Sequence, residues 1–349
     1  MPPFRQSSMD GYAFKYSSET KFDLIGEVQA GVSEDKKLDA QEAVRIFTGA
    51  RVPDDADTVV MQEHVRQKDG NIHIERLPKP FANVRDLGEQ IKEGELALSK
   101  GTYLNEAAIG FLAGLGVQEV SVFNKPSVGV LITGNELQKA GKELEVGQIY
   151  DSNSVTLQLA LNRFDIANVS VSFVKDTLDA TKKAIQAQLD EHDVVLISGG
   201  ISVGDYDFVK EALTANQVQE HFYKVNQKPG KPLWFGSKDE KQVFALPGNP
   251  ASSLSCFYIY VVPALRKMMG YQNIHLARGE AITTSTISNP FQKTRFLKGI
   301  VQENAATPLT GQASSMLKSF AISNVLLEVP AHVERIEAGE AITYIDLKS

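Results

Sequence analysis

The chain has 349 residues, of which 42% are hydrophobic and 23% charged, a composition typical of a globular protein with two to three domains. No apolar run approaches the ~20 residues that span a bilayer, and no signal peptide is recognised, so we expect a cytoplasmic protein without membrane contact. The single cysteine, Cys256, excludes a disulfide framework and a cysteine-based zinc site. The net charge of −7 argues against a general nucleic-acid binder.

Residues 1–125 are predicted to form a β-rich region followed by a linker. Short β-like runs lie at residues 22–29, 43–47 and 58–61, separated by Gly, Pro and Asp. Residues 65–76 are predicted to form a hairpin because they contain the tight-turn pair Asp69-Gly70. One small helix is expected over residues 105–116, where it ends at a glycine.

Residues 126–270 alternate strands with helices. The predicted strands are 127–133, 168–174, 193–198, 222–225, 233–235 and 243–246, and the predicted helices are 154–164, 177–191, 205–214 and 250–269. This alternation predicts an α/β domain with a doubly wound, mostly parallel sheet that is covered on both faces.

Residues 271–349 lose this alternation. Short β-like runs at residues 280–288, 294–302, 325–328 and 341–345 are separated by turn residues. They predict a small C-terminal β-barrel, so the fold class is multidomain α/β with β-rich regions on both sides of the central sheet.

Polar residues follow several of the central strands, at the points where these strands are predicted to end. Thr133-Gly134-Asn135-Glu136 follows the first strand and Lys175-Asp176 the second. A glycine loop follows the third strand, and Pro247-Gly248-Asn249-Pro250 follows a later one. In an open parallel sheet, ligands bind outside the carboxyl ends of the strands, so these residues are predicted to share one crevice.

The glycine loop is the clearest candidate for binding an anion. Gly199, Gly200 and Gly204 flank Ser202, and a helix is predicted to follow. Glycines permit positive φ and let backbone N–H groups approach an oxyanion, and the helix N-terminus adds partial positive charge. No Gly-Lys-Ser/Thr follows, so the loop is not a Walker A motif. The alternative is a plain strand-to-helix turn.

Three acids near the strand ends, Glu136, Asp176 and Asp207, are candidates for Mg²⁺ chemistry. Carboxylates beside phosphate oxygens bind Mg²⁺ together with retained water. Asp207, in the first turn behind the glycine loop, is the predicted metal ligand. The alternative for Asp176 is a capping role at the helix that follows it.

Two further segments are candidates for binding anions. Lys224, Lys228 and Lys231 form a cationic patch in a loop fixed by proline and glycine, although a solvated turn would have the same composition. In the second segment Pro250 suits the first turn of a helix and Asn249 its N-cap position, whichever function holds.

Eight segments carry a resemblance to a known family; in chain order they are SSMDGYAF (7–14), RIFTGARVP (45–53), VVMQE (59–63), TGNEL (133–137), GQIYDSN (147–153), SGGISVGDYDF (198–208), KPGKPLWFG (228–236) and LPGNPAS (246–252). Together they resemble the molybdopterin molybdenumtransferase family, which includes MoeA and the C-terminal domain of gephyrin. These segments span nearly the whole chain, and several are jointly specific. Family members carry a helical segment before the position of Pro2, so the resemblance implies an N-terminally shortened member.

The resemblance implies a reaction: insertion of molybdenum from molybdate into adenylylated molybdopterin, with Mg²⁺-dependent release of AMP. It implies that the glycine loop holds the phosphates, that Asp207 binds Mg²⁺, and that Glu136 and Asp176 hold or polarise the reacting groups. The positions that resemble the family's molybdate and substrate sites are Lys224, Lys228, Pro247, Pro250, Arg295 and Ser315.

The resemblance also implies a homodimer, in which Asp10 and Thr48 approach the cleft from the partner subunit, and contact with other proteins of molybdenum cofactor biosynthesis. One departure is Gln90, which stands where the family usually has an acid. An inactive or scaffolding molybdopterin-binding module and a molybdopterin adenylyltransferase remain the alternative functions.

Overall fold

The computed structural model describes residues 1–32, 36–202 and 207–349. The described chain divides into two compact units, Met1–Val120 and Ser121–Ser349. Gly204, a predicted substrate-binding residue of the glycine loop, lies outside the described residues. The domain boundaries near residues 125 and 270 stay a prediction. Within the described ranges, no helix has both the length and the apolar character needed to cross a membrane.

The first unit is built on a six-stranded sheet, as its β-rich sequence predicts. The sheet order is β5 (Thr58–Met61), β2 (Gly11–Phe14), β4 (Glu42–Ile46), β3 (Lys21–Val28), β7 (Asn71–Ile74) and β6 (Val65–Lys68). The predicted hairpin is β6–β7, with Asp69 and Gly70 at positive φ in its turn. A two-stranded pair joins β1 (Gln6–Ser7) to β8 (Val84–Arg85), the 3₁₀ turn η1 covers Gln62–His64, and the predicted helix is α1 (Glu106–Gly114).

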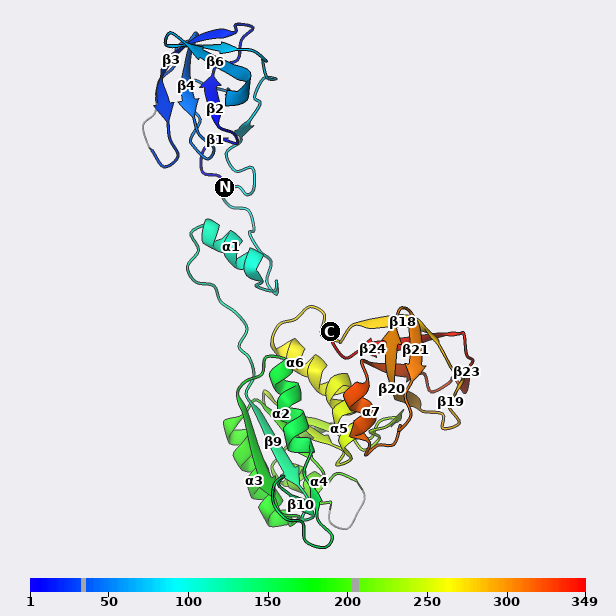
Figure 1. Cartoon of the computed structure of the whole chain (residues 1–349). Helices are drawn as coiled ribbons and strands as arrows, with labels where there is room; N and C mark the ends of the chain where they lie inside the picture. The colour runs from blue at the N-terminus through cyan, green and yellow to red at the C-terminus, as the bar shows by residue number, and fades with distance from the viewer. Residues whose placement is uncertain (33–35, 203–206) are drawn as a thin grey trace. The chain divides into compact units, whose positions relative to one another are not determined.

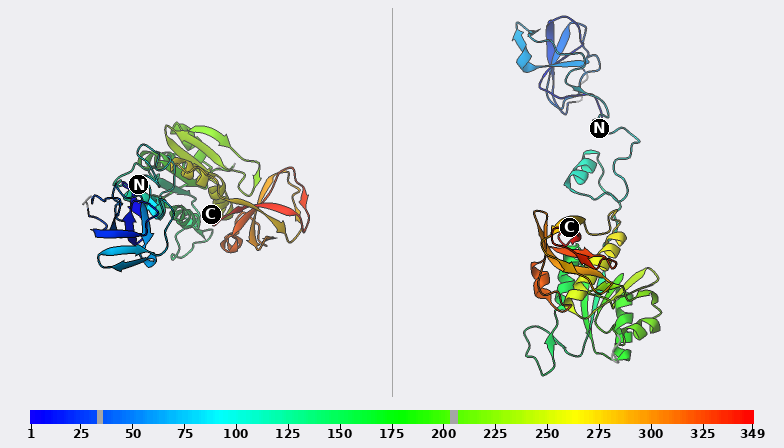
Figure 2. Two further views of the ribbon diagram at one scale, coloured as in Figure 1. Left: turned by 90° about the horizontal axis from the view of Figure 1, so that it is seen from above. Right: turned by 90° about the vertical axis from the view of Figure 1, so that its right-hand side faces the viewer.

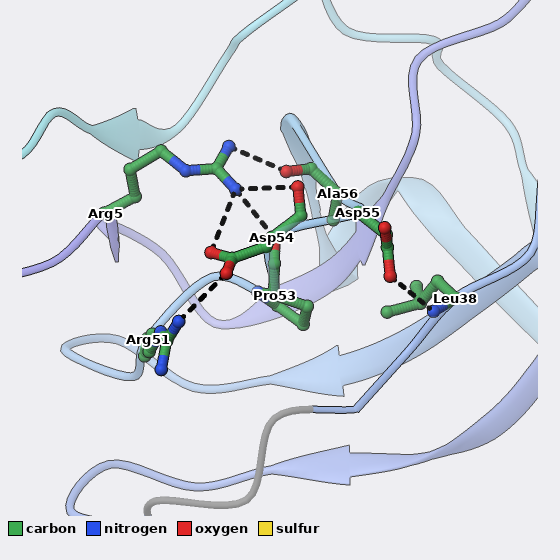
Figure 3. A network of polar contacts seen from close by, with 7 residues as sticks. All are labelled: Arg5, Leu38, Arg51, Pro53, Asp54, Asp55 and Ala56. Atoms are coloured by element: carbon green, nitrogen blue, oxygen red, sulfur yellow. Dashed lines mark hydrogen bonds and ion pairs between the residues drawn. The ribbon is translucent and has the colours of Figure 1, made fainter.

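Arg5 fastens the start of the chain to a turn of the first unit (Figure 3). Its guanidinium donates to the carbonyl oxygens of Ala56 at 2.8 Å, Pro53 at 2.9 Å and Asp54 at 3.1 Å. The Asp54 carboxylate also forms an ion pair with the Arg51 guanidinium, with an N–O distance of 3.1 Å. Several carbonyls are therefore satisfied by one planar donor, which fixes the segment that leads into β1.

The second unit contains the predicted central sheet. Its order is β12 (Val169–Val174), β9 (Val128–Thr133), β13 (Val194–Ser198), β17 (Lys241–Leu246), β16 (Trp234–Lys238) and β14 (Gln219–Tyr223). The first four strands are parallel, and β16 and β14 extend the sheet in antiparallel fashion. The prediction of a mostly parallel sheet is confirmed.

Helices cover both faces of this sheet (Figure 1), as the doubly wound prediction requires. α2 (Asn153–Arg163), α5 (Pro250–Cys256) and α6 (Val262–Met268) pack on one face, and α3 (Leu178–Glu191) and α4 (Val209–Ala215) on the other. Of the predicted helix 205–214, residues 205 and 206 lie outside the described residues, residues 207 and 208 are not helical, and α4 begins at Val209. The predicted helix 250–269 contains a π-helical turn, η2 (Phe257–Val261), just before Pro263, which has no N–H to donate to the preceding turn.

The predicted C-terminal barrel is also present. β20 (Thr294–Gln302), β21 (Ala305–Pro308), β18 (Arg278–Thr283), β24 (Ala341–Asp346) and β22 (Val325–Val329) form a ring that the β20–β22 pairing closes. The barrel lies beside α5 and α6 (Figure 2), and the two parts share one hydrophobic core, in which Tyr258 stacks on Phe320 at 6.2 Å. Shorter elements complete the unit: β10 (Leu137–Gln138), β11 (Ile149–Tyr150), β15 (Gln227–Lys228), β19 (Ile287–Ser288), β23 (Arg335–Ile336) and α7 (Leu317–Ile322).

The turn after β13 strongly favours glycine at its first position. Gly199 has a φ of 97°, and a Cβ added there would lie 2.8 Å from both the carbonyl oxygen and Oγ1 of Thr133, at the end of β9. A side chain at this position would therefore push apart the ends of two neighbouring strands.

We expect Gly199→Ala to lower the free energy of unfolding by about 2–4 kcal/mol, from left-handed strain plus the clash with Thr133. Gly339→Ala is the matched control, because its φ is 92° and no described atom lies within 4 Å of the added Cβ. Urea unfolding of both variants should show the smaller loss for the control. Equal losses would show that the strand ends yield to the added methyl group.

Candidate active site

A cleft of about 680 Å³ lies at the carboxyl ends of the parallel strands in the second unit. Most of its walls come from the segment after β9, the start of α2, the turn after β13 and the turn after β17, and Asp176, Pro232 and Ser315 add to them from other segments. The lining residues are Thr133, Gly134, Glu136, Leu137, Ile149, Tyr150, Asp151, Ser152, Asn153, Asp176, Ser198, Gly199, Gly200, Ile201, Ser202, Asp207, Pro232, Pro247, Gly248, Asn249, Pro250 and Ser315.

Three predicted acids, Glu136, Asp176 and Asp207, all line this cleft. Burial raises the pKa of Asp176 above its ordinary value, a hydrogen bond from the backbone N–H of Asn135 at 3.0 Å opposes the shift, and the charges of Glu136 and Asp207 add to it. Burial is thus the main cause of the raised pKa, and the two neighbouring carboxylates make a smaller contribution of the same sign.

Asp176 does not cap the helix that follows it. Thr177 occupies the N-cap of α3, and its hydroxyl accepts a hydrogen bond from the N–H of Ala180 at 3.4 Å. The interpretation of Asp176 as a helix cap is therefore wrong, and Asp176 instead lines the cleft.

The charge in the cleft is one-sided. The described lining includes four acids, Glu136, Asp151, Asp176 and Asp207, and no lysine, arginine or histidine. Nowhere in the described ranges are three or more His, Cys, Asp or Glu side chains grouped closely enough to hold a metal ion. A divalent cation here would need oxygen ligands from water or from the substrate in addition to the carboxylates, which is how Mg²⁺ is usually bound.

The glycine turn is fixed from its outer side by Tyr223, at the end of β14. The Tyr223 hydroxyl lies 2.9 Å from the carbonyl oxygens of both Ile201 and Ser202, to which it donates. Gly199, Gly200 and Ser202 all line the cleft. Because the carbonyls of Ile201 and Ser202 accept from Tyr223, the turn has a defined orientation.

The second turn combines Pro247, Asn249 and Pro250 with Ser315 from the segment before α7. Asn249 stands at the N-cap position of α5, as predicted, but its side chain makes no capping hydrogen bond. The N–H of Ser252 donates to the carbonyl of Ser314 at 3.1 Å, which places Ser315 beside the start of α5.

Sequence analysis missed the residues at the start of α2. Asp151 accepts hydrogen bonds from the N–H groups of Asn153 at 3.0 Å and Ser154 at 3.2 Å, and also from the Ser154 hydroxyl. Asp151, Ser152 and Asn153 belong to the GQIYDSN segment and all line the cleft. Their signal in the sequence was an acid shortly before the predicted helix 154–164, a pattern typical of a helix N-terminus.

The predicted cations lie elsewhere. Lys224, Lys228, Lys231 and Arg295 are absent from the described lining of the cleft. The Lys228 ammonium lies 3.5 Å from the centre of the Phe291 ring, and Arg295 is its register partner in the β15–β20 pairing. Burial lowers the pKa of Lys228, and the nearby charges of Arg295 and Lys293 lower it further. Their binding role stays a prediction.

Asp10 and Thr48, in the first unit, form a pair. Asp10 Oδ1 accepts from the N–H of Thr48 at 2.7 Å and from its hydroxyl at 2.8 Å. These hydrogen bonds, the backbone one most strongly, lower the pKa of Asp10, and the charge of Arg45 adds to the effect. The pair lies where the neighbouring strands β2 and β4 meet their loops, so Asp10 is an exposed, ionised and oriented carboxylate.

Family comparisons cover most of the chain. Residues 1–116 match the MoeA N-terminal region (domain I and II), residues 129–267 a probable molybdopterin binding domain, and residues 280–347 the MoeA C-terminal region (domain IV).

Individual relatives and solved structures agree with the three family matches. The molybdopterin molybdenumtransferase of Haemophilus influenzae is 35% identical over 98% of this chain and 87% of its own length, and that of Staphylococcus epidermidis is 31% identical over 99% and 85%. A crystal structure of the molybdopterin biosynthesis MoeA protein of Pyrococcus horikoshii has a TM-score of 0.82 with 30% identity, covering 99% of this chain and 88% of its own. With the sheet, barrel and motifs described above, these matches show that the chain belongs to the molybdopterin molybdenumtransferase family, the transferases of molybdenum cofactor biosynthesis.

Proposed function

We propose that this chain transfers molybdenum from molybdate into adenylylated molybdopterin and releases AMP in a Mg²⁺-dependent step. The observation that carries the proposal is a single cleft at the ends of parallel strands, lined by two turns that bear glycine and by the three predicted acids Glu136, Asp176 and Asp207. Free N–H groups at such turns suit phosphate oxygens, and the carboxylates suit a divalent cation that bridges to them.

The donor set fits Mg²⁺. Molybdate and adenylylated molybdopterin are both anions. The described cleft lining is acidic and holds no cationic side chain, so a cation is needed to offset the charge. The pKa of Asp176 is raised chiefly by burial and further by the charges of Glu136 and Asp207, and a cation would offset both effects. Asp207 and Glu136 are the proposed holders of the ion, which when bound would supply charge neutralisation and polarisation of the phosphoanhydride.

Other residues of the cleft are proposed to bind and orient the substrate. Gly200 and Ser202 orient the phosphates through backbone N–H groups, and Asp176 orients a polar group of the substrate or a water molecule. The predicted role of Gly199 is limited to shaping the turn, because its N–H donates to the carbonyl of Leu246 at 3.2 Å. Pro247, Asn249 and Pro250 form the opposite wall, and Ser315 adds a hydroxyl from the C-terminal region. Together these contacts would hold the reacting groups in line before cleavage.

The cationic group outside the cleft is the proposed molybdate side. The ion pairs found within the described ranges involve other lysines and arginines than Lys224, Lys228, Lys231 and Arg295. Cations on a fixed loop and strand favour a tetrahedral dianion. The assignment is supported by the positions of Lys224, Lys228 and Arg295, which resemble the family's molybdate and substrate sites.

The remaining roles are proposed on the family resemblance. Asp10 and Thr48 take part in turnover, supported by their mutual hydrogen bonds in the first unit. The active form is a homodimer, and other proteins of molybdenum cofactor biosynthesis exchange substrate and product with it.

Incubation of the full chain with adenylylated molybdopterin, molybdate and Mg²⁺ should release AMP, and Glu136→Gln or Asp207→Asn should lower kcat by roughly 100-fold or more. Asp239→Asn, in the exposed turn between β16 and β17, is the matched control and should keep full turnover. Release no faster than in a protein-free sample would reject the proposal, and ATP consumption with unmodified molybdopterin would point to an adenylyltransferase.

We expect Asp176→Asn to unfold at the same or a higher temperature than the wild type at pH 7. The substitution removes a half-buried charge together with its repulsion from Glu136 and Asp207, and the new amide oxygen still accepts from Asn135. A carboxyl with a raised folded pKa costs stability above that pKa, so the wild type alone should gain stability as the pH falls through it. Thermal unfolding between pH 4 and 8, with and without Mg²⁺, checks this. A clear loss of stability in the variant at pH 7 would contradict the assigned repulsion.

A further inference from the structure

Asn153, the first residue of α2, joins two turns that are far apart in the sequence. Its Nδ2 lies 2.8 Å from the Ser198 hydroxyl, at the end of β13, and 2.7 Å from the carbonyl oxygen of Gly248, in the turn after β17. A carbonyl oxygen can only accept, so the atom facing Gly248 must be the amide nitrogen. Both hydrogens of that nitrogen are therefore committed.

The two turns that Asn153 joins also touch each other directly. The N–H of Gly199 donates to the carbonyl of Leu246 at 3.2 Å, and a Cβ on Gly248 would lie 3.5 Å from Gly199 Cα. Ser198 and Leu246 are paired in the sheet, and each of the two turns begins directly after one of them. Their backbones are thus in contact at one side and held by Asn153 from α2.

Asn153 is itself held rigidly. It is only 9% exposed, and its backbone N–H donates to Asp151 at 3.0 Å, in the same cap that fixes Ser154. The tether therefore starts from the anchored end of a helix, so the position of α2 is transmitted to both turns.

We propose that Asn153 is a positioning residue, which sets the separation of the glycine turn and the Pro247–Pro250 turn through the two hydrogen bonds of its amide nitrogen. Its catalytic consequence rests on the function proposed above, in which these turns hold the adenylylated substrate. The tether itself does not depend on that function.

Asn153→Ala removes both hydrogen bonds, and Asn153→Asp keeps the shape but removes both donors and sets a charge against the Gly248 carbonyl. Asn162→Ala is the control, on an exposed position of the same helix. In hydrogen-exchange measurements on the full chain, both Asn153 variants should exchange faster than wild type at residues 198–202 and 246–250, whereas the control should not.

In turnover assays, Asn153→Ala should lower kcat/KM for adenylylated molybdopterin by roughly 10–100-fold, the range for two lost hydrogen bonds and a misplaced site. The apparent KM for molybdate should stay within about twofold of wild type, which a general loss of structure would not allow. The Asn162→Ala control should keep wild-type kinetics.

Wild-type exchange in both Asn153 variants would overturn the tether, whatever the enzyme does. Faster exchange with wild-type kinetics would overturn the positioning role. If the wild-type chain itself shows no turnover, the proposed function fails, and faster exchange at the two turns in Asn153→Ala would still establish the tether.

Discussion

The parallel register of β9, β13 and β17 is the constraint on which the cleft depends. Ser198 pairs with Ile132 on one side and Leu246 on the other, so the three strands end at one level of the sheet. All residues of β9 and β13 are buried, which leaves no solvent-facing side toward which a strand could slip. The segments that follow these ends open beside one another, and side chains more than a hundred residues apart in sequence come to share one small volume.

The electrostatics of the site follow from that crowding. The carboxyl of Asp176 is partly buried at the strand ends beside two other acids. Its pKa is raised chiefly by that burial and further by the charges of Glu136 and Asp207. The same strand ends present backbone N–H groups at the glycine turn, which favour negative charge. A site with acids and N–H donors but no described cationic side chain is suited to an anionic ligand that arrives with a cation, rather than to an anion alone. This arrangement is costly for folding and useful for binding, as expected where function competes with stability.

Sequence patterns predicted what depends on local order, and failed where the answer depends on distance in space. Buried apolar runs located β9 and β13, and the rule for parallel sheets predicted that Glu136, Asp176 and Asp207 would converge. The tether from Asn153 was not predictable, because its two partners are fixed only once α2 and two turns are packed. The interpretation of Asp176 as a cap was wrong because the adjacent Thr177 competes for the same N–H groups. In the barrel, β21 and α7 were missed because four- and six-residue segments carry too little periodicity.

The C-terminal barrel belongs to the structural basis of the site. β15, which carries Lys228, pairs with β20 of the barrel and so takes its position from the barrel rather than from the central sheet. Ser314 accepts from Ser252 of α5, which brings Ser315 to the cleft, and the stacked rings of Tyr258 and Phe320 belong to one core common to both parts. Because these links are buried or hydrogen-bonded, displacement of the barrel would move the lysine loop and Ser315 together. A shared core of this kind couples the geometry of the proposed molybdate side to that of the strand ends, so the two halves of the proposed reaction depend on one packed unit.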